Sequence, residues 1–206
     1  MGTLTLCAID VDDMHQWFGA SDPLVDELRQ LAQPLTARDD KPPLIGKIGP
    51  LFKHPTAPIM TLPKPSDDDV NALLEGRSVP ADRVVFAWVI VRHWMRQRGH
   101  HWLEVELDNH QLAVLDFSLV SGGLSSQFSF ETVLARDPHL PLLPRHGLTV
   151  GWMPSHHVAK AVVQWPNAFE IAAARPEVAD AVDALRGFAE ALGDGQPSDV
   201  VALYQQ

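Results

Sequence analysis

Several short runs of alternating hydrophobic and polar residues predict the strands of a sheet. Alternation with a period of two places every second side chain on one face, as in a half-buried strand. Strands are expected at 3–9, 103–107, 147–153 and 200–204. A further apolar run ends at Phe117 after the turn-like residues Asp108 to His110, so 103–117 is interpreted as a hairpin. Residues 128–134 fit either a strand or a short helix.

Residues typical of helix starts and stops frame the predicted helices. Ser66 and Asp69 have the spacing of a capping box, three acidic residues fill the first turn, and Gly76 follows the last apolar position. The same signals predict further helices at 10–18 before Gly19, from Pro23 onward, at 155–165 before Pro166, and at 176–192 before Gly193.

The segment 81–98 is predicted to be the central helix. Pro80 precedes it, Gly99 follows it, and basic residues gather at its end, where the helix dipole favours them. Its first half is apolar all round, which indicates burial on most sides. Its β-branched residues also allow a strand, but the length and the flanking residues favour a helix.

Residues 34–65 differ from the rest of the chain because they contain eight prolines. Proline at this density interrupts both helices and central strands. Many apolar residues lie among the prolines, so we interpret the segment as an irregular excursion packed against the body and not as a domain boundary. The pattern as a whole predicts one α+β domain over 1–206, with a mixed or antiparallel sheet packed with several helices.

The charge and the composition limit which kinds of partner and which cellular compartment we expect. The formal net charge is −10, which disfavours nucleic-acid binding. The longest apolar run, Val84 to Val91, is too short to span a membrane. The single cysteine, Cys7, excludes an intramolecular disulfide, and its apolar neighbours predict a buried, unreactive thiol. Without an export signal, the expected compartment is the cytoplasm.

Part of the sequence resembles a known family. The C-terminal segments TVGWMPSHHVAKAV, PEVADAVDALRGFAEAL and DVVALYQ, together with the N-terminal CAIDVDDMHQWFG and the internal PHLPLLP, are similar to an uncharacterised actinobacterial family related to the YfbM-like proteins. The resemblance covers about half of the chain. It implies an α+β fold and no established activity, so it supplies no catalytic residues.

Ten histidines raise the question of a metal site. Two pairs are adjacent, His100-His101 and His156-His157, but neighbouring side chains point in different directions, so each pair offers at most one ligand to a site. No zinc-binding, phosphate-loop, dinucleotide-binding or nucleophile-elbow motif occurs. The sequence therefore predicts neither a metal nor a cofactor.

Aromatic residues with histidine and arginine neighbours supply the candidate binding residues. Most of the six tryptophans are expected in the core. The alternative is that some line a pocket or act as anchors for a protein partner. The candidates on that hypothesis are Arg92, His93, Trp94, His101, Trp102, Trp152 and His157.

Two functions remain open at this point. The first is a non-catalytic cytoplasmic binding or interaction protein, immunity-like or regulatory, whose basic partner would contact the acidic residues Asp67 to Asp69. The second is a histidine-dependent hydrolase, with or without a metal. It requires at least two of four histidines at one pocket with a carboxylate, namely His93, His101, His110 and His157.

Overall fold

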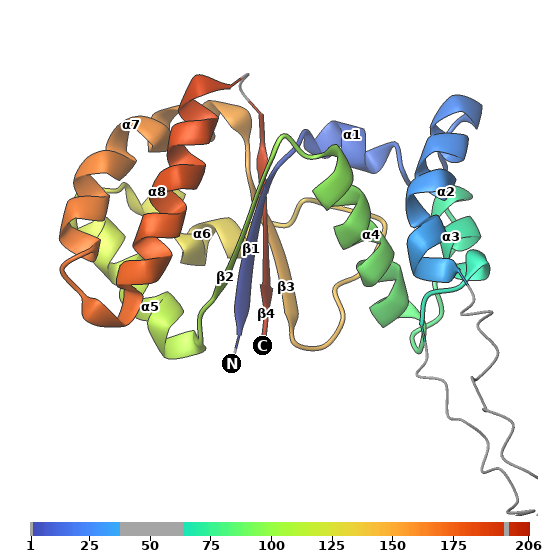
Figure 1. Cartoon of the computed structure of the whole chain (residues 1–206), viewed down its shortest axis with the longest axis horizontal. Helices are drawn as coiled ribbons and strands as arrows, with labels where there is room; N and C mark the ends of the chain where they lie inside the picture. Colours follow the sequence, from blue (N-terminus) through green and yellow to red (C-terminus); the bar gives the residue numbers. More distant parts are fainter. Residues whose placement is uncertain (1, 38–63, 196–197) are drawn as a thin grey trace, which may run out of the picture.

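Antiparallel pairing joins four strands into a sheet in the order β2-β1-β4-β3. A computed structural model describes residues 2–37, 64–195 and 198–206 (Figure 1). The strands are β1 (Thr3–Ala8), β2 (His101–Glu106), β3 (Leu148–Met153) and β4 (Val200–Gln205). The first and last strands therefore pair with each other at the centre of the sheet, with Thr3 opposite Gln205 and Ala8 opposite Val200.

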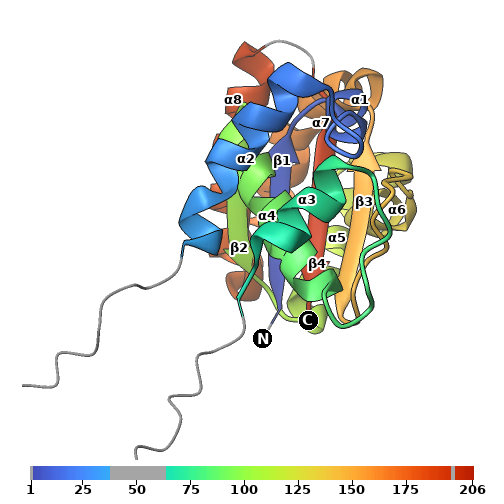
Figure 2. The ribbon, with the colours of Figure 1, turned by 90° about the vertical axis from the view of Figure 1, so that its right-hand side faces the viewer.

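Helices cover both faces of the sheet, giving an α+β single-domain fold. One face carries α5 (Asn109–Ser121), α6 (Phe130–Ala135), α7 (Ser155–Ala172) and α8 (Ala179–Asp194), with the short 3₁₀ helices η1 (Ser126–Phe128) and η2 (Pro176–Val178) between them (Figure 1). The other face carries α1 (Val11–His15) and α4 (Val84–Arg98). Outside α4 lie α2 (Asp22–Thr36) and α3 (Asp67–Leu74), as Figure 2 shows from that side.

The alternation within β1 divides the hydrophobic residues between two cores. Leu4 and Leu6 join the core under α5, α7 and α8, whereas Cys7, and Ile9 directly after the strand, join the core under α4. Both central strands are buried on both faces, which explains why β4 reads as a continuous apolar run. The predicted strands at 3–9, 147–153 and 200–204 are confirmed.

The predicted hairpin at 103–117 is wrong, because only its first half is a strand and the second half is α5. Asp108 is the N-cap of this helix: Gln111 N donates to Asp108 Oδ1 at 2.8 Å, and Asp108 N donates to Gln111 Oε1 at 3.0 Å. This reciprocal capping box satisfies two helix-terminal groups and turns an apparent hairpin turn into a helix start. For the ambiguous segment 128–134, the helix alternative holds, as α6.

Two prolines that were predicted to lie outside helices are inside them. α7 continues through Pro166 to Ala172, and the packing of Trp165 and Phe169 in the core offsets the hydrogen bond that proline cannot donate. Pro34 lies in the last turn of α2, so residues 34–36 are helical and do not belong to the predicted irregular excursion. The rest of that prediction, over 38–63, lies outside the described residues.

Two predicted helix ends differ by a few residues from the observed ones. α1 ends at His15, short of the predicted Phe18, and α8 continues through Gly193 to Asp194. The capping box of Ser66 and Asp69 and the central helix α4 are confirmed. The first half of α4 is not buried all round, however, because Val85 and Val89 are 41% and 42% exposed.

One aspartate caps two helices at once. Asp199, just before β4, accepts a hydrogen bond at Oδ1 from Ser155 N of α7 (2.7 Å) and at Oδ2 from Val11 N of α1 (3.2 Å). These helices lie on opposite faces of the sheet, so a single carboxylate joins both layers to the central strands.

Candidate functional site

The seven predicted binding residues do not form one site. Trp94 is fully buried, packs edge to face against Trp17 with ring centroids 6.0 Å apart, and donates from Nε1 to Leu28 O at 2.9 Å. Its indole therefore joins α4 to α2 within the core.

Arg92 and Trp102 lie together where α4 crosses β2. Arg92 pairs with Glu104 (Nη2 to Oε2, 2.8 Å) and donates to Thr5 Oγ1 at 3.2 Å. The guanidinium groups of Arg92 and Arg96 lie 5.9 and 6.0 Å from the Trp102 ring, within the range of cation–π attraction. The candidates Arg92 and Trp102 therefore belong to one cluster of cationic and aromatic side chains.

His157 and Trp152 lie elsewhere, near the segment that follows α6. His157 Nδ1 is 3.1 Å from Arg136 Nη1, and its ring packs edge to face on Phe128. Burial, followed by repulsion from His156, Arg136 and Lys160, lowers the pKa of His157. Trp152 Nε1 donates to Asp137 O at 3.1 Å.

The remaining histidines are also separated. His93 is on α4 and His101 is on β2, whereas His110, on α5, lines a hollow that also contains Glu177. The requirement of the hydrolase hypothesis, two of these histidines at one pocket, gains no support from this arrangement. Within residues 2–37, 64–195 and 198–206, no group of three or more His, Cys, Asp or Glu side chains could hold a metal ion.

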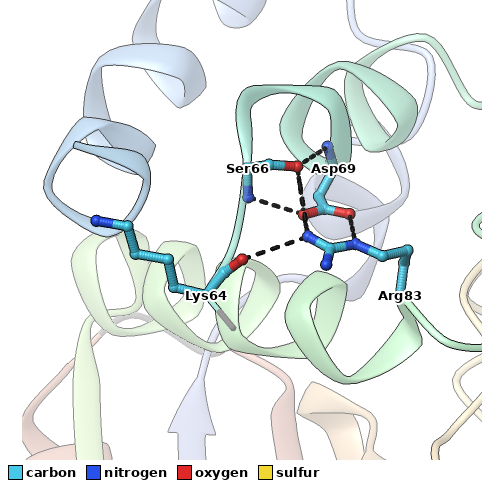
Figure 3. Close-up of polar contacts among 4 residues, drawn as sticks. All are labelled: Lys64, Ser66, Asp69 and Arg83. Carbon is cyan, nitrogen blue, oxygen red and sulfur yellow. Dashed lines mark hydrogen bonds and ion pairs between the residues drawn. The ribbon is translucent and has the colours of Figure 1, made fainter. Parts of the chain in front are cut away.

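The predicted acidic contact surface, Asp67 to Asp69, is partly a structural ion pair (Figure 3). Asp69 is only 4% exposed and pairs with Arg83, whose Nε donates to Oδ1 at 2.8 Å. Ser66 donates to Asp69 Oδ2 through N (2.8 Å) and Oγ (2.7 Å), and Arg83 also donates to Lys64 O. Burial alone would raise the pKa of Asp69, but the hydrogen bonds from Arg83 and Ser66 outweigh it and lower the pKa. Asp69 therefore joins α3 to α4 and is not available to a partner.

A surface that the sequence analysis missed lies on α5. Phe117 is 69% exposed, while Leu115 and Leu119 of the same helix are fully buried in the core. On the side of α6, Phe117 borders a hollow of about 610 Å³ that Asp116 and Glu131 also line. Burial raises the pKa of Asp116 despite the hydrogen bonds it accepts from the start of α6.

The other side of Phe117 borders a second hollow, of about 320 Å³, with His110, Arg175 and Glu177 at its edge. We call Phe117, Ala113 and these two hollows the Phe117 surface. Once 109–121 is treated as a helix, its apolar residues are too many for one buried face, so a sequence signal for this surface was present. This signal was missed because 103–117 was interpreted as a hairpin.

None of the helices that the structure describes is long and apolar enough to span a membrane.

Comparison of the chain with protein-family models, with curated proteins and with solved structures gave no match. The resemblance to the YfbM-related family therefore stays a prediction.

Proposed function

We propose that this chain is a non-catalytic cytoplasmic binding protein, regulatory or immunity-like, that binds another protein through the Phe117 surface. The observation that carries the proposal is the exposure of Phe117 between two hollows, on a helix whose opposite side is in the core. The partner that fits is a protein segment with an apolar side chain beside basic residues.

The apolar part of this proposal rests on the side chains around Phe117. An exposed aromatic ring flanked by depressions can insert into a partner while the partner fills the hollows, which is the arrangement of an interface hot spot. Full burial of a phenylalanine side chain contributes about 1.5–3 kcal/mol. Ala113, one turn before Phe117, is also exposed and extends the same face without a bulky side chain.

The choice of a basic partner rests on charge. The larger hollow contains the carboxylates of Asp116 and Glu131 and, among the residues that the structure describes, no basic side chain. A lysine or arginine that enters this hollow would pair with these carboxylates where solvent is partly excluded. The net charge of −10 adds a long-range attraction that accelerates association with a basic protein.

Selection of peptides tests the proposal directly. A phage-displayed library of random peptides is selected on the wild-type protein and depleted on the Phe117→Ser variant. We expect the retained peptides to combine lysine or arginine with an aromatic or aliphatic residue, and to bind less tightly at high salt. Peptides that bind the variant equally well, or that are acidic, would contradict the proposal.

Two controls separate charge from folding and from self-association. Glu131→Gln keeps the shape of the larger hollow and removes one charge, so it should weaken the selected peptides by a few-fold and reduce their salt dependence. Light scattering of the wild type should give a monomer at micromolar concentration. A dimer that dissociates in Phe117→Ser would instead assign the surface to a second copy of this chain.

A further inference from the structure

A small cavity, separate from the Phe117 surface, lies on the opposite face of the sheet. The end of α4 is held close to β1 at Gly99, but the helix moves away from the strands toward its start (Figure 1). The wedge between them contains a cavity of about 50 Å³. Its walls come from β1, β3, β4, α4 and the segment before β3, so it depends on the complete fold.

The cavity is positively charged within a strongly acidic protein. Arg92 of α4 and Arg145 of the segment before β3 line it, and none of the described residues that line it is acidic. Arg92 is partly neutralised by Glu104, 2.8 Å away. Among the residues that the structure describes, Arg145 has no ion-pair partner, so the cavity retains a net positive charge.

A buried hydroxyl group supplements the two arginines. Thr5 is only 2% exposed and lines the cavity, although its position in β1 would suit an apolar residue. Its Oγ1 accepts a hydrogen bond from Arg92 at 3.2 Å, which leaves its single proton for donation elsewhere. Thr3 and Gln205, paired across β1 and β4, add polar groups at the same end of the cavity.

The remaining lining is hydrocarbon. Trp88 and Val89 of α4 face Leu148 and Leu203 of the sheet across the cavity. The Trp88 ring is fixed because its Nε1 donates to Leu143 O at 2.8 Å. A ligand must therefore combine a negative group with a short apolar part.

We propose that this cavity binds a small organic anion. Its oxyanion lies between Arg92 and Arg145 within reach of the Thr5 hydroxyl, and its short hydrocarbon part lies against Trp88 and Val89. Guanidinium groups suit the planar, two-oxygen geometry of a carboxylate, and two of them line this cavity. The cavity volume is less than twice the roughly 30 Å³ that one water molecule occupies in the liquid, which limits the hydrocarbon part to about one carbon.

Titration of the ¹⁵N-labelled full chain with acetate tests the proposal. The resonances to follow are the Trp88 indole N–H and the side-chain Nε–H groups of Arg92 and Arg145. We expect them to shift to saturation, with a dissociation constant of about 10 mM or lower. Acetamide, which has the same shape without the charge, should bind at least about tenfold more weakly.

Two arginine variants locate the site. Arg145→Ala removes a side chain without a described ion pair, so the protein should keep its fold and lose at least about tenfold in acetate affinity. Arg186→Ala, on α8 across the sheet, should bind acetate as the wild type does. Inorganic phosphate should bind more weakly than acetate, because it lacks the hydrocarbon part.

Four results would overturn the proposal: no saturable shift of these resonances, equal binding of acetate and acetamide, unchanged acetate affinity in Arg145→Ala, or phosphate binding as tightly as acetate.

Discussion

The backbone of Gly99, at the end of α4, packs directly against the sulfur atom of Cys7 in β1. A Cβ atom on residue 99 would lie 2.4 Å from Cys7 Sγ and 3.3 Å from Ala8 O. The glycine is therefore required by a close approach and not by its backbone angles, since its φ of −68° suits any residue. This contact fixes one end of α4 on the sheet, while its other end leaves room for the cavity lined by Arg92 and Arg145.

Substitution of Gly99 by alanine should lower the free energy of unfolding by about 1–3 kcal/mol, because the helix end must move to admit the methyl group. The matched control is Gly187→Ala in the interior of α8, where nothing lies within 4 Å of an added Cβ. That change should be neutral or stabilise by about 0.5–1 kcal/mol. Urea denaturation of both variants gives the comparison, and equal effects would refute the close contact.

Asp199→Ala should destabilise the protein by about 1–3 kcal/mol, because it removes the acceptor for the first N–H of both α1 and α7. Hydrogen exchange should accelerate at the first turns of both helices. Asp194→Ala, at the exposed end of α8, should leave the free energy of unfolding nearly unchanged. Acceleration at only one helix in Asp199→Ala would show that the double cap does not form.

The ion pair of Asp69 with Arg83 predicts a defined dependence of stability on pH. The folded-state pKa of Asp69 is lowered, so its contribution is fully present above the unfolded-state pKa of about 3.9 and is lost as the pH falls through the folded-state value. Asp69→Asn should cost about 1.5–3 kcal/mol at pH 7. The gap to the wild type should narrow as the pH falls below about 4.

Asp67→Asn is the control for this experiment, because Asp67 is exposed in the same first turn. Its effect should stay within about 0.5 kcal/mol at each pH. A gap between wild type and Asp69→Asn that stays constant down to pH 2 would disprove the lowered pKa.

Two buried serines should respond to alanine in opposite ways. Ser118 Oγ has no hydrogen-bond partner among the described residues, so Ser118→Ala should leave the melting temperature unchanged or raise it. Ser129 is equally buried, but its Oγ accepts from Thr132 N as the N-cap of α6. Ser129→Ala should lower the free energy of unfolding by about 0.5–2 kcal/mol. A similar loss in both variants would reveal a partner for Ser118.

The sequence predicted those parts of the fold whose signals are local. The capping box of Ser66 and Asp69 was recognisable from spacing, and β4 was recognisable from its apolar residues. The start of α5 was not predicted because Asp108-Asn109-His110 resembles a turn. Gln111 at the third helical position was nevertheless a signal for a helix. The predicted helix end at Pro166 was wrong because tertiary packing of α7 outweighed the tendency of proline to interrupt a helix.

The sites depend on contacts between distant segments, which no spacing shows. Arg92 was a candidate because of its aromatic neighbours. Arg145 lines the same cavity only because the chain between α6 and β3 brings it there. Trp94 was a candidate for the same reason as Trp102, yet one is in the core and the other lies beside two arginines. Residue type alone did not distinguish them, since tryptophan serves both roles.

The affinity of a selected basic peptide for three proteins tests the central claim most directly. Isothermal titration calorimetry compares the wild type, Phe117→Ser, and Val163→Ser, whose side chain on α7 is 77% exposed and lies outside the Phe117 surface. We predict a loss of about tenfold or more for Phe117→Ser and wild-type affinity for Val163→Ser. Equal affinity for all three proteins, or an equal loss in both variants, would contradict the assignment of the Phe117 surface as the binding site.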